Sequence, residues 1–406
     1  ESAARMLELQ SGTVDGIDNP SVDDIAKIKA DPELQYKERL ANNTLYIGFN
    51  NKYKPFDDVR VRQAIAMGID RERIVNNFYA PGSEVADFFT PCLIPNACVG
   101  TPWYEFDVAK AKELLKEAGY PDGFKTTITL RTAVRPYIPD PPAIATEVQA
   151  QLKQNLNIDA EIVVLESGAM LDQAAAGTIE GIHLLGWNAD YPHITDWLDF
   201  YFGASQKQFG EPFKEIYEPL KEGAKIADPD KAKEYYVKAN NAVRELVPMV
   251  PVVHSASGVA YRADVKNAHA SPLGNEYFAV MIPGERDKFV FMQNAEPISL
   301  FCNDETDGES LRVCEQAMES LLSFKPGTQE VAPGLATACN PNEDLTEWTC
   351  NLRKNVKFHD GSTLTADDVV MSWWVSWDYN MPLHIGSTGA FEYFVTLWGN
   401  FLNAPQ

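Results

Sequence analysis

The stretch TTITLRTAVRPYIPDPPAIATEVQAQLKQNLNIDAEIVVL, residues 126–165, predicts a strand, a helix and a second strand in turn. Apolar and β-branched residues are concentrated in 126–131 and 160–165, as in strands, whereas 142–156 has the length and composition of a helix. The alternation continues with a helix and a strand within 170–187. Strands that alternate with helices of about 10–15 residues favour a sheet with crossover connections. We therefore expect an α/β fold.

The same signals extend in both directions from this stretch. A strand is predicted over 44–50, and an amphipathic helix over 59–78 has its apolar residues on one face. Asp107 is placed to cap a helix that runs to Ala118, and the densely charged stretch 213–246 also has a helical pattern. The α/β pattern thus continues well beyond the opening stretch.

A second organisation begins with a predicted strand over 289–292. Further along, Thr365 and Asp368 have the spacing of a capping box at the start of a helix. Because 406 residues exceed the size at which one hydrophobic core stops growing, we expect two lobes with a hinge between them. The expected second lobe is 50–262, and the expected first lobe is assembled from 1–49 and 263–406.

Composition and charge exclude some classes of function. The apolar fraction of 45% and the charged fraction of 23% are ordinary for a soluble globular protein. The 58 acidic and 35 basic residues give a formal net charge of −23. So acidic a surface repels phosphate backbones, and the sequence has no basic stripe to counter it, so we expect no nucleic-acid partner.

Six cysteines form three close pairs, Cys92 with Cys98, Cys302 with Cys314, and Cys339 with Cys350. They form no CxxC motif, and no histidine stands at zinc-finger spacing from them, which argues against a structural metal site. Three local disulfides, which would imply an oxidising compartment, are one interpretation. Buried free thiols are the other.

The motifs of common enzyme classes are absent from the sequence. It has no GxSxG, GxxxxGK[ST] or HExxH motif, and no GxGxxG in a strand–helix setting. His183 lies inside a predicted strand, where a structural histidine is more typical than a catalytic one. We expect no catalytic residue, no metal and no cofactor. A secreted glycan hydrolase stays as the alternative, suggested only by abundant tryptophans and carboxylates.

Two charged residues follow directly after predicted strands, which is where open α/β sheets bind ligands. Asp190 comes after the strand over 181–187, and its carboxylate could face a ligand ammonium; a turn-former or a helix cap is the alternative. Arg135 follows the strand over 126–131 and could bind a carboxylate through two parallel hydrogen bonds; a solvated loop arginine is the alternative. Together they would form the two ends of a site for a zwitterion.

Several long stretches resemble the peptide/nickel type of extracytoplasmic solute-binding proteins, especially the dipeptide-binding members. The stretch NNKYKPFDDVRVRQAIAMGIDR, residues 50–71, resembles the most recognisable motif of that family. VAPGLA at 331–336, and LRKNVKFHDG at 352–361 followed by TADDVV at 365–370, resemble its other hallmarks. The similarity covers nearly the whole chain and implies a two-lobed fold like that of periplasmic binding proteins.

The resemblance also implies roles for individual residues. In dipeptide-binding relatives, the acidic residue after a Gly-Trp strand end holds the α-ammonium of the peptide, and this position corresponds to Asp190. The arginine of an Arg-Pro-Tyr loop holds the peptide carboxylate, and this position corresponds to Arg135. The other implied ligand-binding residues are Gly186, Trp187, Asn188, Tyr137, Glu296 and Ser299.

The function implied by the resemblance is capture of a short peptide for import by an ABC transporter. A longer peptide, an oligosaccharide or a metal chelate is the alternative ligand. The implied partners are this solute and the membrane permease of the importer. We expect a monomer in the periplasm or outside the cell, and a lipid anchor on the precursor is left open.

The order of the matching stretches departs from that of the family. Residues 287–406 resemble the family's amino-terminal part, and residues 1–283 resemble its later part. This order implies either an engineered permutation with a junction near Pro283 or fragments that are numbered out of their natural order. A first-lobe segment of roughly a hundred residues, about the size of a small domain, would be absent between Gln406 and Glu1.

Overall fold

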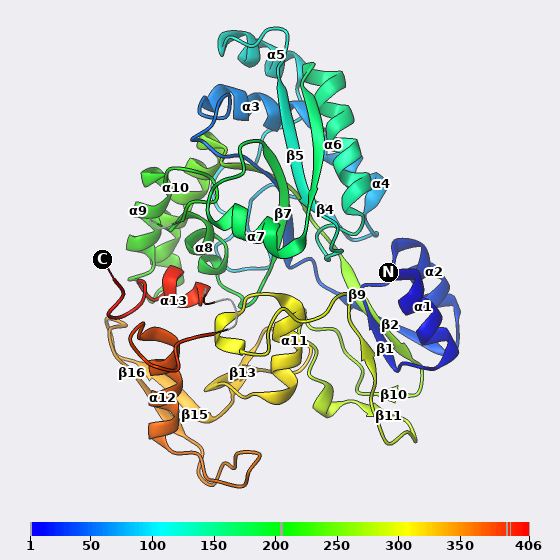
Figure 1. The fold of residues 1–406 in the computed structure, drawn as a ribbon, viewed down its shortest axis with the longest axis vertical. Coiled ribbons are helices and arrows are strands. Elements are labelled where there is room, and N and C mark those ends of the chain that lie inside the picture. Colours follow the sequence, from blue (N-terminus) through cyan, green and yellow to red (C-terminus); the bar gives the residue numbers. More distant parts are fainter. Residues whose placement is uncertain (1, 204–205, 387–388, 390, 406) are drawn as a thin grey trace.

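The computed structural model of the chain describes residues 2–203, 206–386, 389 and 391–405, so the end residues 1 and 406 of the expected first lobe lie outside the described residues. Two sheets organise the fold (Figure 1). The larger sheet has the strand order β4 (Glu84–Val85), β8 (Met249–His254), β3 (Asn43–Gly48), β7 (Ile182–Asn188), β5 (Lys125–Arg131), β6 (Asp159–Leu165). The smaller sheet has the order β12 (Phe291–Met292), β1 (Gly16–Asp18), β9 (Ser257–Arg262), β2 (Leu34–Arg39).

The helices follow these strands along the chain, which confirms the predicted α/β class. Those of the amino-terminal half are α1 (Ser2–Ser11), α2 (Val22–Ala30), α3 (Val59–Gly68), α4 (Arg71–Phe78), α5 (Val108–Glu117), α6 (Pro141–Leu156), α7 (Ser167–Ala175) and α8 (Leu198–Phe202). The later ones are α9 (Lys214–Gly223), α10 (Pro229–Leu246), α11 (Gly308–Ala317), α12 (Ala366–Trp377) and α13 (Glu392–Thr396). Among the described residues, no helix is both long enough and apolar enough to cross a membrane.

The six-stranded sheet contains the main core of the molecule. β5 pairs in parallel with β6 and β7, and β3 pairs antiparallel to both β7 and β8. Every residue of β3 and every residue of β8 is buried, because helices cover the sheet. The strands predicted around residues 126–131, 160–165 and 181–187 are β5, β6 and β7. The carboxyl ends of these three parallel strands lie at the same edge of the sheet.

Two short links connect the two sheets. β2 leads into β3 through residues 40–42, and β8 leads into β9 through residues 255–256. β3 lies in the six-stranded sheet, and β9 lies in the four-stranded sheet. The division expected from the sequence instead assigns β3 to the first lobe and β9 to the second lobe. Both links lie a few residues before the expected boundaries at positions 49–50 and 262–263.

Two helices that the sequence predicted as continuous are interrupted. The helix expected over 59–78 ends at Gly68, and α4 begins after Asp70, whose side chain accepts a hydrogen bond from the backbone NH of Arg73 at 2.9 Å. The charged helix expected over 213–246 is likewise split into α9 and α10, and Asp228 caps α10. In both places an aspartate side chain satisfies free NH groups of a new first turn, which stabilises a break that apolar periodicity does not reveal.

The part of the chain after β12 is built from small hairpins and single helices. The antiparallel pairs are β13 (Leu322–Phe324) with β14 (Val331–Pro333), and β15 (Ala336–Pro341) with β16 (Trp348–Leu352). β10 (Val265–Lys266) and β11 (Ile282–Pro283) form another such pair just before it. Three disulfides, Cys92–Cys98, Cys302–Cys314 and Cys339–Cys350, confirm the predicted pairing of the cysteines.

Candidate functional site

Asp190 lies two residues beyond the end of β7 and does not cap a helix. Its backbone NH donates to Oδ2 of Asp196 at 2.9 Å, which fixes the turn after the strand. Its own carboxylate accepts a hydrogen bond from the hydroxyl of Tyr393 on α13, a residue that is distant in the sequence. The side chain therefore points away from its own turn and toward the carboxyl-terminal segment.

Arg135 lies in the loop after β5, and the structure rules out the alternative of a solvated loop arginine. Only 7% of the residue is exposed. Its guanidinium forms ion pairs with Asp307 (Nη2 to Oδ1, 3.0 Å) and with Glu309 (Nη1 to Oε1, 3.2 Å). Both carboxylates belong to the start of α11. Arg135 is thus turned toward the same carboxyl-terminal part of the chain as Asp190.

A close approach of Tyr137 to β7 connects these two loops. The Tyr137 ring is buried against Gly186, where any side chain would collide with the ring and with the carbonyl oxygen of Thr44. The Tyr137 hydroxyl accepts a hydrogen bond from Arg131 at 3.3 Å. Glycine is therefore required at position 186 so that the Arg135 loop can lie against the strand end.

The last residues of β7 are only partly exposed. The indole NH of Trp187 donates to Oδ1 of Asp196 at 3.2 Å, and its ring packs on Phe200 with a centroid separation of 4.2 Å. Asn188 is half-buried and pairs with Asn43 in the sheet register. Asp196 thus organises the strand end by accepting hydrogen bonds from Trp187 and Asp190 at once.

The opposing side of the site is held by a disulfide and by a buried ionic network. Cys302–Cys314 closes the loop that contains Asp307 onto α11. Arg312 of α11 donates from Nη2 to Oδ2 of Asp18 at 3.0 Å, and Asp18 also pairs with Arg39. These contacts anchor α11 to the four-stranded sheet. The site therefore lies where the two sheet regions meet.

Electrostatics around the strand end are unfavourable to the ionised carboxylates. Burial raises the pKa of Asp190 to about 7, against the lowering effect of the Tyr393 hydrogen bond, and the charges of Glu392 and Asp307 add to the rise. Burial, followed by the charge of Asp190, also raises the pKa of Asp196 well above its ordinary value. A buried carboxylate with a raised pKa is one that a cation would stabilise.

The two remaining predicted residues differ in their placement. Ser299 is half-buried, and its hydroxyl lies close enough to Glu305 to lower the pKa of that carboxyl by hydrogen bonding. Glu296 is exposed, and no hydrogen bond or ion pair among the described residues links it to Asp190, Arg135 or Ser299.

Sequence reasoning missed the residues on the opposing side. These are Glu305, Asp307, Glu309, Glu392 and Tyr393. An acidic run directly before a helix, DETDGE at residues 304–309, was the available signal. It was masked by the many other carboxylates in so acidic a chain.

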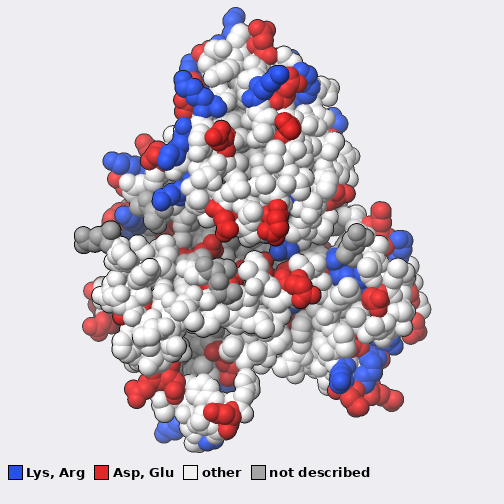
Figure 2. All heavy atoms as spheres, viewed as in Figure 1, with Lys and Arg blue, Asp and Glu red and all other residues white. Residues whose placement is uncertain are grey.

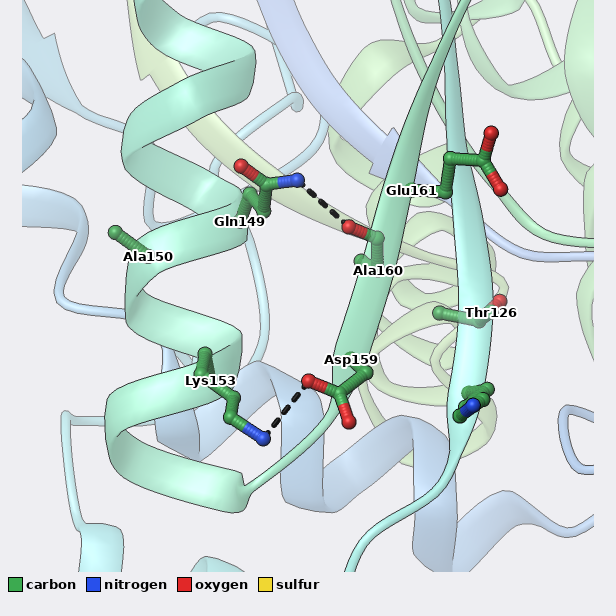
Figure 3. Close-up of a pocket in the computed structure, with 8 residues that line it drawn as sticks. Thr126, Gln149, Ala150, Lys153, Asp159, Ala160 and Glu161 are labelled. Atoms are coloured by element: carbon green, nitrogen blue, oxygen red, sulfur yellow. Dashed lines mark hydrogen bonds and ion pairs between the residues drawn. The ribbon is translucent and has the colours of Figure 1, made fainter.

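A second feature of the surface lies apart from this interface. Figure 2 shows acidic side chains around the hollow between the upper and lower parts of the visible face. A surface pocket of about 580 Å³ lies elsewhere, between α6 and the amino ends of β5 and β6 (Figure 3). Lys153 and Asp159 form a 2.8 Å ion pair across it, and both side chains are about half exposed. It is about 20 Å from the carboxyl strand ends at 3.3 Å per residue, so we do not connect it with Asp190 and Arg135.

Comparisons with known proteins identify the family of the chain. The profile of a family described as bacterial extracellular solute-binding proteins, family 5 Middle, matches residues 1–209 and 330–391, which is more than half of the chain. Di/tripeptide-binding protein 1 of Pseudomonas aeruginosa is 29% identical over 70% of this chain and 53% of its own length. Heme-binding protein A of Haemophilus influenzae is also 29% identical, over the same shares of the two chains.

Solved structures give the same result for the fold. The periplasmic binding protein DppA from Helicobacter pylori, in complex with the peptide STSA, has a TM-score of 0.59 and 26% identity, over 66% of this chain and 52% of that one. HbpA2 from Haemophilus parasuis has a TM-score of 0.58 and 29% identity, over 70% and 56% of the two chains. These matches confirm the predicted two-lobed α/β fold. The chain spans about half the length of the curated relatives that it matches. It belongs to the bacterial extracellular solute-binding proteins of family 5.

Proposed function

We propose that the chain captures a short peptide for import by an ABC transporter, at the interface between the end of β7 and the segment that carries α11 and α13. Asp190 holds the peptide ammonium, and Arg135 holds its carboxylate. One observation carries the proposal: Asp190 and Arg135 come from separate loops of the larger sheet, yet both contact this same opposing segment. A ligand between them would therefore contact both regions of the molecule.

The present partners of these residues resemble parts of such a ligand. Arg135 is paired with two carboxylates, the group found at a peptide's carboxyl terminus. Asp190 accepts a hydrogen bond, as it would from an ammonium. The interface thus satisfies the charge of Arg135, and one hydrogen bond of Asp190, with its own side chains. A peptide has to displace these contacts, so binding requires the two regions to separate before they close again.

The energetics favour a zwitterion over a neutral solute. A charged group buried without a partner costs several kcal/mol, so each end of the ligand has to meet its complement. Removing one partner of such a buried pair costs about 2–5 kcal/mol. The two charged residues therefore supply selectivity as well as affinity.

The direct test is calorimetry with Ala-Ala on the wild type and on Asp190→Asn and Arg135→Ala. Each variant should lose about 2–5 kcal/mol of binding free energy, because each leaves one ligand charge buried without a partner. Arg353→Ala, at an exposed arginine, is the matched control and should bind like the wild type. Circular dichroism should show that the variants remain folded.

Modified ligands test the same assignment without any mutation. N-acetyl-Ala-Ala lacks the ammonium and Ala-Ala-amide lacks the carboxylate, so both should bind the wild type far more weakly than Ala-Ala. Equal affinity for all three would refute the zwitterion site. A hydrolase, the competing class, would instead convert its substrate with turnover, whereas a binding protein takes up one ligand per chain.

The wider assignments belong to the same proposal. The partners are the peptide and the permease of an importer, the chain acts as a monomer outside the cytoplasm, and it has no catalytic role. We place the crossings between its lobes at residues 40–42 and 255–256, on the strength of the strand pairing. In a ligand-bound structure, the change in backbone angles should be concentrated in these two links.

A further inference from the structure

Four carboxylates meet at the interface and form what we call the acidic cluster: Asp190, Glu305, Asp307 and Glu392. Thr306 donates from its hydroxyl to Oε2 of Glu392 at 2.6 Å, which holds the loop before α11 against the start of α13. Tyr393, next to Glu392, donates to Asp190. The cluster is therefore one contiguous group assembled from three segments of the chain.

Glu305 has a carboxylate oxygen without a partner. The residue is only 6% exposed, and its Oε1 has no hydrogen-bond partner among the described residues. Burial raises the pKa of Glu305 to about 7, and the neighbouring charges of Asp304, Asp307 and Glu392 add to the rise. A buried carboxylate with one oxygen left without a partner is costly unless a cation reaches it.

The surrounding chain does not supply that cation. Within the described residues, no ion pair links Asp190, Glu305 or Glu392 to a lysine, arginine or histidine. Arg135 is the nearby arginine, and it is already shared between Asp307 and Glu309. The sequence itself has no lysine or arginine in residues 289–311 or in residues 358–406. The negative charge of the cluster thus exceeds what the zwitterion site of the proposed function can balance.

We propose that the preferred ligand is a basic peptide, whose Lys or Arg side chain lies against Glu305 and Glu392 while its α-ammonium lies at Asp190. This inference rests on the proposed function and specifies its substrate class. A second cation pairs with the uncompensated carboxylates, whereas an acidic side chain in the same place would add a like charge in a buried setting. Selectivity then comes from both attraction and repulsion.

Calorimetry with the dipeptides Lys-Ala, Ala-Ala and Glu-Ala tests the proposal on the intact chain. Lys-Ala should bind roughly ten- to a hundredfold more tightly than Ala-Ala, and Glu-Ala should bind more weakly than both. In the double variant Glu305→Gln/Glu392→Gln, the ratio of Lys-Ala to Ala-Ala affinity should fall toward one. The control Glu343→Gln removes one exposed carboxylate far from the cluster and should keep the wild-type ratio.

The outcomes separate this inference from the proposed function. If Ala-Ala and Lys-Ala bind the wild type with equal affinity, the basic-peptide preference is wrong and the peptide site stands. If none of the three dipeptides binds, the proposed function fails and this inference fails with it. The comparison of ligands on the wild type decides the question even if the double variant does not fold.

Discussion

The six-stranded sheet and the segment from β13 to α12 differ in how far their apolar side chains are buried. In the sheet, Leu45, Tyr46 and Ile47 are fully buried along β3. In the segment, Trp348 is 59% exposed and Val370 is 62% exposed, and α12 buries only Ser376. Apolar residues that would suit a core thus remain on the surface of the second region. The difference shows that a helix or hairpin can form from local signals while its packing depends on what covers it.

The largest expected effect comes from truncating equivalent aliphatic side chains in the two regions. Ile47→Ala creates a cavity in the middle of the sheet and should lower the free energy of unfolding by about 2–5 kcal/mol. Val370→Ala removes an exposed β-branched residue from α12, where alanine has the better helix propensity. This change should alter the free energy of unfolding by less than about 0.5 kcal/mol. Urea unfolding of both variants measures the contrast. Similar losses would mean that α12 is packed as tightly as the sheet.

The second prediction uses a charge instead of a methyl group. Burial raises the pKa of Asp199, on α8 beside the main core, to about 7, from an ordinary value of 3.8. The unfolded chain therefore loses this proton first, and the carboxyl lowers stability progressively as the pH rises from about 4 to about 7. Asp199→Asn removes this penalty. Its melting temperature should exceed that of the wild type increasingly over this range. Its free energy of unfolding should be higher than that of the wild type by at most about 4 kcal/mol above pH 7.

Asp344 provides the control for that experiment in the exposed region. Hydrogen bonds from Thr346 lower the pKa of Asp344, so it is ionised in both the folded and the unfolded chain near neutrality. Asp344→Asn should therefore give a melting-temperature difference that does not vary between pH 5 and pH 7, where the difference for Asp199→Asn grows. If Asp199→Asn shows no pH-dependent gain, its carboxyl is not buried as the structure has it.

A third prediction concerns two disulfides of similar span. Cys302–Cys314 encloses the acidic loop of the proposed site, whereas Cys339–Cys350 joins the exposed hairpin β15–β16. Replacing the first pair by serines should weaken Lys-Ala binding by about tenfold, because Glu305 and Asp307 are no longer held in place. Replacing the second pair should leave binding within about twofold. Calorimetry on both variants gives the result, and equal losses would indicate an effect on overall stability alone.

The sequence predicted the helix caps and strand ends, which depend on residues close together along the chain. Asp107 caps α5 by accepting from the backbone NH of Lys110, and the capping box of Thr365 and Asp368 is present at the start of α12. The strand ends that carry Arg135 and Asp190 were also predicted, because alternation and turn chemistry are local. The resemblance to a family then indicated which of these ends to consider together.

The contacts of the site could not be predicted in this way. Arg135 pairs with Asp307, which is 172 residues away along the chain, and Asp190 accepts from Tyr393, which is 203 residues away. No periodicity or motif links such positions, since their proximity depends on how the two sheets meet. The break at Asp70 was missed for the opposite reason: the apolar pattern continues across it, and one side-chain cap decides against a continuous helix.

The smallest expected effect tests whether α12 unfolds together with the rest of the molecule. Asp107→Ala and Thr365→Ala each remove a helix cap, a change that typically costs about 1 kcal/mol. α5 packs on α3 within the main core, so the first variant should lose that amount in global unfolding. α12 has few buried side chains, so the second should fray locally instead and leave global unfolding within about 0.5 kcal/mol of the wild type. Hydrogen exchange separates the two cases. Thr365→Ala should accelerate exchange in the first turn of α12 alone. If it instead lowers global stability as much as Asp107→Ala does, α12 belongs to the same cooperative unit as the sheet.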